Sequence, residues 1–322
     1  MIRALWLCAV SALAVTNALA ADGQYPSKPI NLLVTGIAGG PPDMVARWIA
    51  GKLAPALGQP IVVINRAGAG GNLAMQAAAS SAPDGYTLVI AGQGPFALNP
   101  HMYARPGYDA LKDFAPITQI ERGSLILAVH PEVPVRSVGD LVRLAKERPG
   151  QLSYGSPGIG TPPHMVSELF SRIAQIDVLR VPYPGPPPAM VDLMAGRLTY
   201  TFGGIPTQLA QVRAGTIKAL AVTGAVRTPL VPDIPTIAES GFPGFEYSGW
   251  LGIAAPAGTP KAIVAKLHSE IAKILQTADA KDYLAGQGRE GVGSSPEEFS
   301  AYIRQEFTKW APVIRDAGIR GE

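Results

Sequence analysis

Short apolar runs alternate with amphipathic stretches along nearly the whole chain, and this alternation constrains the fold more than any other feature of the sequence. An apolar run of about five residues predicts a buried strand, whereas apolar residues three or four apart predict a helix. Strands separated by helices form βαβ units, so an α/β protein is expected. Strands are expected at 30–35, 61–64, 87–91, 125–130, 152–154, 178–182, 198–202, 219–223 and 250–254. Helices are expected at 44–57, 72–79, 162–174, 187–195, 207–214, 261–275, 280–287 and 296–317, and after Ser137, where Asp140 fits a capping box.

The chain has 322 residues, which is room for two domains of about 100–200 residues each. With 47% hydrophobic and only 16% charged residues, neither a disordered polyelectrolyte nor a coiled coil fits. A formal net charge of +3 provides no basic footprint for a phosphate backbone, so no nucleic-acid partner is expected.

The first twenty residues read as a secretory signal peptide. Arg3 precedes an apolar run at 4–15, and the small residues of Ala18-Leu19-Ala20 predict cleavage between Ala20 and Ala21. Twelve apolar residues span about 18 Å as a helix, against about 30 Å of hydrocarbon, so a membrane anchor is excluded. We therefore expect the mature chain to be exported to the periplasm.

The single cysteine, Cys8, lies inside this leader. Its neighbours Trp6 and Leu7 are too bulky for a lipidation site, so the chain is not expected to be a lipoprotein. The mature chain then has no thiol, which excludes disulfides, thiolate metal sites and a cysteine nucleophile.

Four glycine-rich loops follow predicted strands and lead toward predicted helices. Ligands of open α/β sheets bind at the carboxyl ends of the strands, so these loops are the expected site. Glycine lets backbone N–H groups approach a ligand, and a helix N-terminus favours a negative group. Together with Gln93, Ser156, Thr161, Tyr183 and Thr207, the loops suit reversible capture of a small anion. The loops are 36–43, 92–95, 155–161 and 202–206.

Catalytic and cofactor motifs are weak by comparison. Gly92-x-Gly94-x-x-Ala97 fits a loose dinucleotide fingerprint, but Pro95 spoils the binding helix, and no P-loop is present. Ser156 does not lie in a nucleophile elbow. The four histidines show no metal-ligand spacing, and only His164, near a helix start, is a candidate site residue. Asp43 also lies at a helix start, where capping is the favoured interpretation over catalysis. No cofactor, metal site or enzymatic activity is expected.

At these same residues the sequence resembles the Bug or TctC-like substrate-binding proteins of tripartite tricarboxylate transporters. The resemblance extends from Tyr25 to the C-terminus. Its blocks are Ala56-Leu57-Gly58-Gln59-Pro60, Asn65-Arg66-Ala67-Gly68, Ala82-Pro83-Asp84-Gly85-Tyr86, Leu111-Lys112-Asp113-Phe114, Val181-Pro182-Tyr183, Ala219-Leu220-Ala221-Val222-Thr223 and Ala255-Pro256-Ala257-Gly258-Thr259-Pro260.

The resemblance implies a type II periplasmic binding protein fold, with two α/β lobes joined by crossover strands that close on a ligand. It places lobe 1 at 25–124 plus 248–322 and lobe 2 at 125–247. It further implies a monomer that binds a small carboxylate and delivers it to the membrane permease subunits of such a transporter. The implied ligand-binding residues are Ala38, Gly39, Gly40, Asp43, Gly92, Gln93, Ser156, Thr161, His164, Tyr183, Gly203 and Gly204.

The chain departs from the family pattern within this implied pocket. Gly36 stands where the family usually has an aromatic residue. Pro41 and Pro42 have no N–H group, so the loop loses two backbone hydrogen-bond donors. Where the family usually has Phe-Asp-Asn, this chain has Phe202-Gly203-Gly204, and the usual Tyr-Lys-Gly is replaced by Tyr183-Pro184-Gly185. The usual serine-rich helix start is replaced by Thr161-Pro162-Pro163. We infer a roomier, more apolar pocket that favours a carboxylate with an apolar or aromatic body over an amino acid. The alternative is that these changes leave specificity unaltered.

Two other functions stay open from sequence alone. One is a periplasmic sensory module that docks on a signalling receptor, because a docking surface carries no motif. The other is an exported enzyme on the same fold, which the lack of a paired acid and base disfavours.

Overall fold

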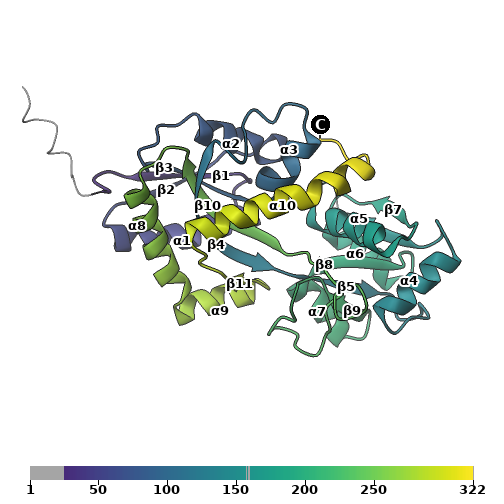
Figure 1. Ribbon diagram of the computed structural model, residues 1–322. Helices are drawn as coiled ribbons and strands as arrows, with labels where there is room; N and C mark the ends of the chain where they lie inside the picture. Colours follow the sequence, from purple (N-terminus) through teal and green to yellow (C-terminus); the bar gives the residue numbers. More distant parts are fainter. Residues whose placement is uncertain (1–24, 157, 159, 322) are drawn as a thin grey trace, which may run out of the picture.

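The computed structural model describes residues 25–156, 158 and 160–321, and its chain forms two α/β lobes that lie side by side (Figure 1). The predicted signal peptide, its cleavage site and Cys8 lie outside the described residues. Each lobe is built on one mixed sheet, so the predicted two-lobed α/β class is confirmed.

The first sheet has the strand order β11-β4-β10-β3-β1-β2. Strand β1 pairs in parallel with β2 and β3, whereas β10 is antiparallel to both β3 and β4. Its strands are β1 (Ile30–Val34), β2 (Ile61–Asn65), β3 (Thr87–Gly92), β4 (Phe114–Gly123), β10 (Gly249–Pro256) and β11 (Glu290–Gly291). The helices from the same parts of the chain are α1 (Pro41–Leu57), η1 (Ala69–Gly71), α2 (Asn72–Ala79), η2 (Gly94–Leu98), α3 (Asn99–Met102), α8 (Lys261–Leu275), α9 (Ala278–Gly286) and α10 (Pro296–Asp316).

The second sheet has the order β7-β6-β8-β5-β9, which repeats the β2-β1-β3-β10-β4 arrangement of the first. In both sheets an antiparallel strand, β10 or β5, is inserted among strands that run parallel to one another, and in the first sheet the short edge strand β11 is also antiparallel to its neighbour β4. The strands are β5 (Leu125–Val129), β6 (Ser153–Ser156), β7 (Leu179–Pro182), β8 (Tyr200–Gly204) and β9 (Lys218–Val222). The intervening helices are α4 (Val138–Glu147), α5 (Pro162–Ala174), α6 (Pro186–Met194) and α7 (Ile205–Arg213).

The inserted antiparallel strands are the ones that the chain enters on crossing between the sheets. Strand β4 continues through Ser124 directly into β5, and the return passes through Tyr247 and Ser248 into β10. These crossings fall at the predicted limits of the lobes at 124/125 and 247/248, which remain a prediction.

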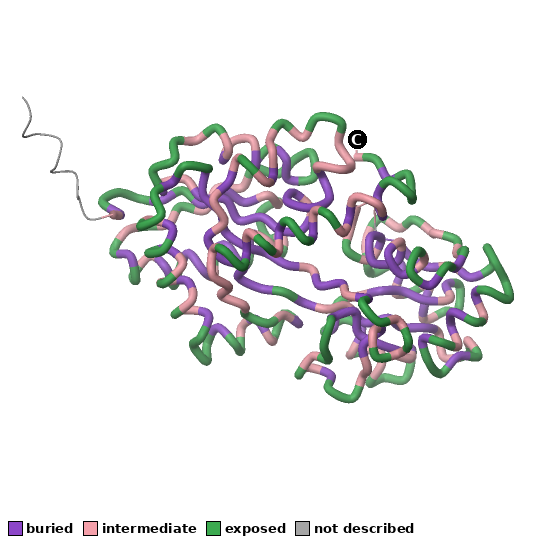
Figure 2. Tube along the Cα trace, viewed as in Figure 1, coloured by how far each residue is buried: buried purple, intermediate pink, exposed green. Residues whose placement is uncertain are grey.

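Helix α10 also links the lobes, because it packs against both of them. Figure 1 shows it running from one lobe to the other. Its first half buries Phe299 and Ile303 against the first sheet. Its second half buries Trp310 and Val313 in a core shared with second-lobe residues such as Phe170. The buried chain segments are concentrated in the two sheets and in the helix faces that cover them (Figure 2).

Most predicted elements are present, but the long strand β4 was missed. It contains Pro116 and buries the polar side chains of Thr118, Gln119 and Glu121, which break the apolar pattern expected of a strand. The predicted cap of α4 is confirmed, since Ser137 accepts a hydrogen bond from the Asp140 N–H. The reciprocal bond of a capping box is not made to Ser137, because the Asp140 carboxylate accepts from the Arg136 N–H instead.

Candidate functional site

The predicted loops meet in pairs at the carboxyl edges of the two sheets. Strands β1 and β3 are neighbours, and each ends at a glycine-rich segment of lobe 1. Strands β6 and β8 are neighbours in the same way in the second sheet. A loop follows a strand and leads toward a helix in the predicted segments 36–43, 92–95 and 155–161, whereas at 202–206 the chain passes directly from β8 into α7.

These loops are shorter than predicted, because the strands run further than the apolar runs suggested. Gly203 and Gly204 are the last residues of β8 and pair with Ile126 and Leu125 of β5. Helix α7 begins directly at Ile205. The two glycines are therefore strand residues, contrary to the predicted loop at 202–206.

Asp43 fastens the loop between β1 and α1. Its buried carboxylate accepts hydrogen bonds from the Gly39 N–H at 2.8 Å, from Arg47 Nε at 2.9 Å and from Asn65 Nδ2 at 2.9 Å. The Arg47 bond lowers the pKa of Asp43 to about 2 against the opposing effect of burial, and the Gly39 and Asn65 bonds add to the lowering. Helix α1 has no side-chain cap, so the capping interpretation is wrong and Asp43 holds the loop before the helix instead. A ligand contact through its oxygens stays a prediction.

An Asp43→Asn variant is expected to be about 2 kcal/mol less stable than the wild type at pH 7, because hydrogen bonds to a charged acceptor are lost. The folded-state pKa is depressed, so the stabilisation from ionised Asp43 is complete above the ordinary value of 3.8 and lost as the pH falls toward 2. Urea unfolding at pH 7, pH 3 and pH 2 checks this, with the exposed Asp282→Asn as the control. A stability difference that stays constant down to pH 2 contradicts it.

The loop before α5 is fastened in the same way by His164. Its Nδ1 atom accepts a hydrogen bond from the Gly160 N–H at 3.0 Å, four residues earlier, as the Asp43 carboxylate does with Gly39. Burial and, to a smaller extent, the Arg180 charge together lower the pKa of His164 to about 4, so the ring is neutral at pH 7. The proton then sits on Nε2, which faces Glu168 Oε1 at 3.6 Å.

The two helices share the sequence pattern Gly-x-Pro-Pro followed by a polar residue. The paired prolines occupy the first two helical positions, where they provide no N–H group. The third position is Asp43 in α1 and His164 in α5, and neither backbone N–H has an acceptor among the described residues. These two amides, together with the positive ends of the helices, are available to donate to an anion.

The glycines of the first loop serve its turn. Gly39 has a φ of 76°, which favours glycine, and Gly40 donates its N–H to the Ile37 carbonyl at 3.1 Å. Ala38 is exposed, and its N–H has no acceptor in the described part of the chain.

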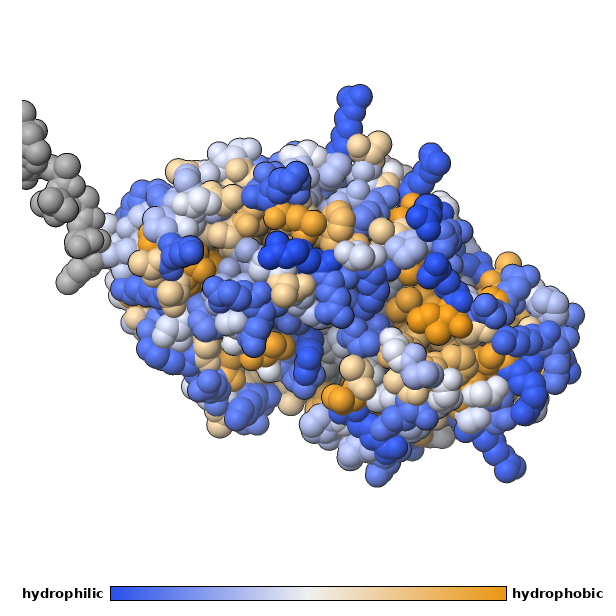
Figure 3. Space-filling model, viewed as in Figure 1, coloured by the Kyte–Doolittle hydropathy of each residue, from blue (hydrophilic) through white to orange (hydrophobic). Residues whose placement is uncertain are grey.

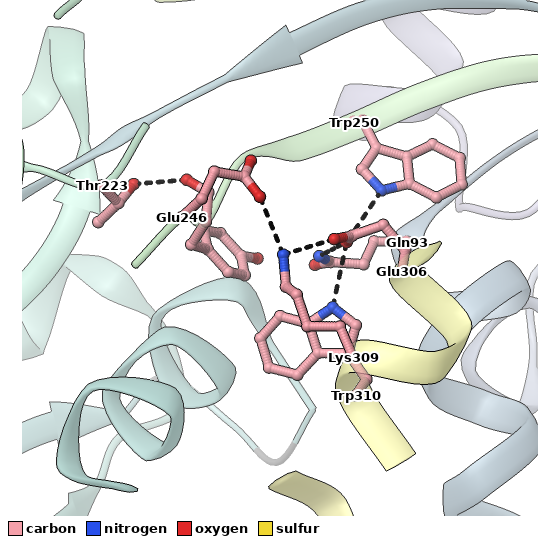
Figure 4. Close-up of polar contacts among 8 residues, drawn as sticks. Gln93, Thr223, Glu246, Trp250, Glu306, Lys309 and Trp310 are labelled. Carbon is pink, nitrogen blue, oxygen red and sulfur yellow. Dashed lines mark hydrogen bonds and ion pairs between the residues drawn. The ribbon is translucent and has the colours of Figure 1, made fainter. Parts of the chain in front are cut away.

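The side-chain amide of Gln93 is already hydrogen-bonded within the protein. Its Nε2 donates to Glu306 Oε2 of α10 at 2.7 Å, and both side chains are buried (Figure 4). The same carboxylate accepts from the indole N–H groups of Trp310 at 3.1 Å and Trp250 at 3.4 Å. Glu306 was not predicted, because a glutamate in an amphipathic helix looks like a surface residue.

Lys309 balances the charge of Glu306. Its ammonium group contacts Glu306 Oε1 and donates to Glu246 Oε2 at 3.0 Å, on the segment that returns to lobe 1 (Figure 4). Burial disfavours the charged form, but Glu306 and Glu246 outweigh it and raise the pKa of Lys309 above its ordinary value. The network joins the Gln93 loop, α10 and one crossover.

The remaining predicted residues make internal contacts. The Ser156 hydroxyl is buried and lies 3.3 Å from the Gly158 carbonyl, to which Thr161 Oγ1 also donates at 2.8 Å. Tyr183 donates its hydroxyl to Asp192 Oδ2 at 2.6 Å. Burial and that bond raise the pKa of Tyr183 to about 12. Their contact with a ligand stays a prediction.

At two of the places where the lobes meet, a glycine of one lobe lies close to a side chain of the other. A Cβ atom placed on Gly160 would lie 2.9 Å from Met102 Cε of α3, and one on Gly288 would lie 2.6 Å from Pro206 Cδ of α7. Close to the second contact, a cavity of about 140 Å³ is lined by residues of β4, of both crossovers and of the segment 288–290.

A second cavity of about 140 Å³ lies wholly within the second lobe. It opens at the starts of α5, α6 and α7, where Gly203, Gly204 and Thr207 line it. Gln208 also lines it, and no sequence signal distinguished this glutamine from other polar residues of a predicted helix.

The described residues hold no group of three side chains able to bind a metal ion. Among them, no helix combines the length and the apolar character needed to cross a bilayer. On the face shown in Figure 3, the apolar areas are separated by hydrophilic side chains.

Comparison with known proteins identifies relatives over most of the chain. A family model described as "Tripartite tricarboxylate transporter family receptor" (TctC) matches residues 45–319. Protein BugT from Bordetella pertussis is 34% identical over 297 residues, covering 92% of this chain and 91% of BugT.

Two solved structures resemble the fold. The Rpa4515 protein of R. palustris with adipate has a TM-score of 0.75 and 38% identity, covering 92% of this chain and 99% of that one. MatC from Rhodopseudomonas palustris with bound malate has a TM-score of 0.72 and 30% identity, covering 90% of this chain and 100% of that one.

Proposed function

The chain belongs to the TctC family of solute-binding receptors, and from this premise we propose that it captures a small organic carboxylate between its lobes and delivers it to a tripartite tricarboxylate-type transporter. The relatives bound to adipate and malate support the carboxylate class. Receptors of this family are periplasmic, which agrees with the signal peptide proposed at residues 1–20 and its cleavage near Ala20.

The observation that carries the carboxylate assignment is the geometry of the α1 start. The Ala38 and Asp43 N–H groups have no acceptor in the described structure, while Asp43 itself is neutralised by Arg47. Two neutral amides at the positive end of a long helix suit one carboxylate group. The proposed binding residues are the predicted ones, with Asp43 and His164 contributing backbone N–H groups.

Thermal unfolding with a panel of hexanoate, adipate, phenylacetate and glutamate tests the proposal. A ligand present at about one hundred times its Kd stabilises the folded state by about 2.7 kcal/mol. We expect carboxylates with apolar bodies to stabilise the protein and glutamate not to do so, because no side-chain carboxylate lines the second-lobe cavity to hold an ammonium group. Stabilisation by glutamate alone contradicts this. Mass spectrometry of a ligand retained through purification identifies the natural carboxylate.

Uptake of that labelled carboxylate by cells lacking this chain separates transport from sensing. Loss of uptake supports delivery to a transporter. Unchanged uptake with a lost transcriptional response supports the sensory module instead.

A further inference from the structure

A third cavity, of about 130 Å³, lies beside the first turn of α1. Pro41, the first residue of this helix, lines it together with Met44 and Val45. An α-helix rises by about 1.5 Å per residue, so the Asp43 N–H group lies within one turn of this wall. The cavity is therefore within reach of a molecule whose carboxylate binds at the start of α1.

The polar wall of the cavity comes from β4 and from the end of α9. Its members are Glu121, Tyr283, Gln287 and Arg289. Gly288, between the last two, faces the second lobe, because a Cβ atom on it would lie 2.6 Å from Pro206 Cδ of α7. The segment 287–289 thus contacts the starts of α1 and α7, and the cavity borders the junction of the lobes.

Glu121 places a carboxylate with unused hydrogen-bonding capacity in this cavity. Its side chain is 2% exposed, and its ionic partner is Arg289, whose Nη1 lies 3.5 Å from Glu121 Oε1. No described residue donates a hydrogen bond to the carboxylate, yet neither oxygen is a fully enclosed atom without a partner, so the carboxylate faces the cavity that it lines. Burial raises the pKa of Glu121, and the Arg289 charge opposes the rise. A buried carboxylate that lacks a donor is costly, and natural proteins retain few such groups.

Arg289 brings hydrogen-bond donors to the same place. Its side chain is 30% exposed, and its Nη1 donates to the Gly249 carbonyl at 3.2 Å. Its other N–H groups have no acceptor within the described part of the chain. An acceptor with a negative charge and a donor with a positive charge therefore stand side by side in the cavity.

A neutral hydroxyl group matches this pair better than an ion does. A carboxylate accepts from Arg289 but is repelled by Glu121, and an ammonium group donates to Glu121 but is repelled by Arg289. A hydroxyl group accepts from the guanidinium and donates to the carboxylate, and both bonds are strengthened by the charge of the protein group.

We propose that this cavity binds the hydroxyl group of a hydroxycarboxylate, which accepts from Arg289 and donates to Glu121 while its carboxylate is bound at the start of α1. The inference rests on the proposed function and narrows its substrate class. It makes Glu121 and Arg289 specificity-determining residues.

Two series of straight-chain carboxylates that differ at the far end test this by isothermal titration calorimetry. The far end is a methyl, hydroxyl, carboxylate or ammonium group in butyrate, 4-hydroxybutyrate, succinate and 4-aminobutyrate, and in hexanoate, 6-hydroxyhexanoate, adipate and 6-aminohexanoate. In at least one series the hydroxyl member is expected to bind about tenfold more tightly than the methyl member, and more tightly than both charged members.

Glu121→Gln is expected to shift two ligands in opposite directions. The hydroxyl member should bind about threefold more weakly, because a hydrogen bond to a neutral acceptor is weaker than one to a carboxylate. The dicarboxylate should bind more tightly, because it no longer meets a negative charge. A merely structural role of Glu121 would weaken all members alike.

Glu290→Gln is the matched control. Glu290 is exposed, pairs with Arg122 at 2.7 Å and lies outside the lining of this cavity, so the variant should keep the wild-type order of ligands. Thermal unfolding shows whether each variant folds. The order of ligands in the wild type tests the proposal even if Glu121→Gln does not fold.

The outcomes separate the two proposals. Carboxylates that bind without a hydroxyl preference, or a charged member that binds most tightly in both series, overturn the role of Glu121 and Arg289 and leave the proposed function standing. An order of ligands that is unchanged in folded Glu121→Gln overturns it as well. If no carboxylate binds at all, both proposals fail.

Discussion

Replacing Glu306 by alanine is expected to lower the free energy of unfolding by about 3–5 kcal/mol, the range found when one partner of a buried ion pair is removed. The Glu306 carboxylate is 2% exposed and accepts from Gln93, Trp250 and Trp310 as well as from Lys309. Without it, three neutral N–H groups lose their acceptor and the buried ammonium keeps only one of its two carboxylates.

Urea unfolding followed by tryptophan fluorescence measures this effect. Gln305→Ala changes an exposed neighbour on the same helix and should cost less than about 0.5 kcal/mol. Glu306→Gln keeps an acceptor and should fall between the two. A loss below about 1 kcal/mol for the alanine variant would show that the network contributes little to stability.

Gly92→Ala is expected to destabilise the protein by about 3 kcal/mol, the upper part of the usual range for overpacking. A Cβ atom at this position would lie 2.2 Å from the carbonyl oxygen of Trp250, and a backbone atom of a central strand cannot move aside as a side chain can. The variant must therefore separate β3 from β10, at the strand that continues from the return crossover.

Gly94→Ala provides the matched control, because a Cβ atom there has no neighbour within 4 Å. Both variants are compared by thermal and urea unfolding. Equal stability of the two would contradict the packing role of Gly92 and would leave close approach of a ligand as the reason for glycine.

The fold was largely predictable, because the spacing of apolar residues in each strand and helix reflects which of its faces are buried. Residues 32–34 and 88–91 are apolar and buried, since both faces of their sheet are covered. Strand β4 escaped prediction because its buried polar residues are matched by partners distant in sequence, such as Ser294, whose backbone carbonyl accepts from Thr118 Oγ1. Such compensation is not visible in a local pattern.

The candidate site was predictable in its location but not in its internal bonding. The four predicted segments fall at strand ends, as the alternation requires, although 202–206 forms no loop. The roles of individual side chains depended on partners elsewhere: Gln93 is held by Glu306, 213 residues away in sequence, and Gln208 occupies the space above Gly203. The prolines at the starts of α1 and α5 were visible from the start, whereas the matching Gly39–Asp43 and Gly160–His164 bonds were not.

The sequence by itself determined the α/β class and the family, because these follow from local periodicity and from residue blocks that a relative shares. It also supplied the segments that we propose to carry the site. Only the tertiary structure decided that α10 joins both lobes, that Glu306 is buried, and that Gln208 is buried with one unpartnered oxygen. The pattern of apolar and polar residues along the sequence indicates which residues prefer burial. It does not record which distant groups satisfy the polar atoms that are buried with them.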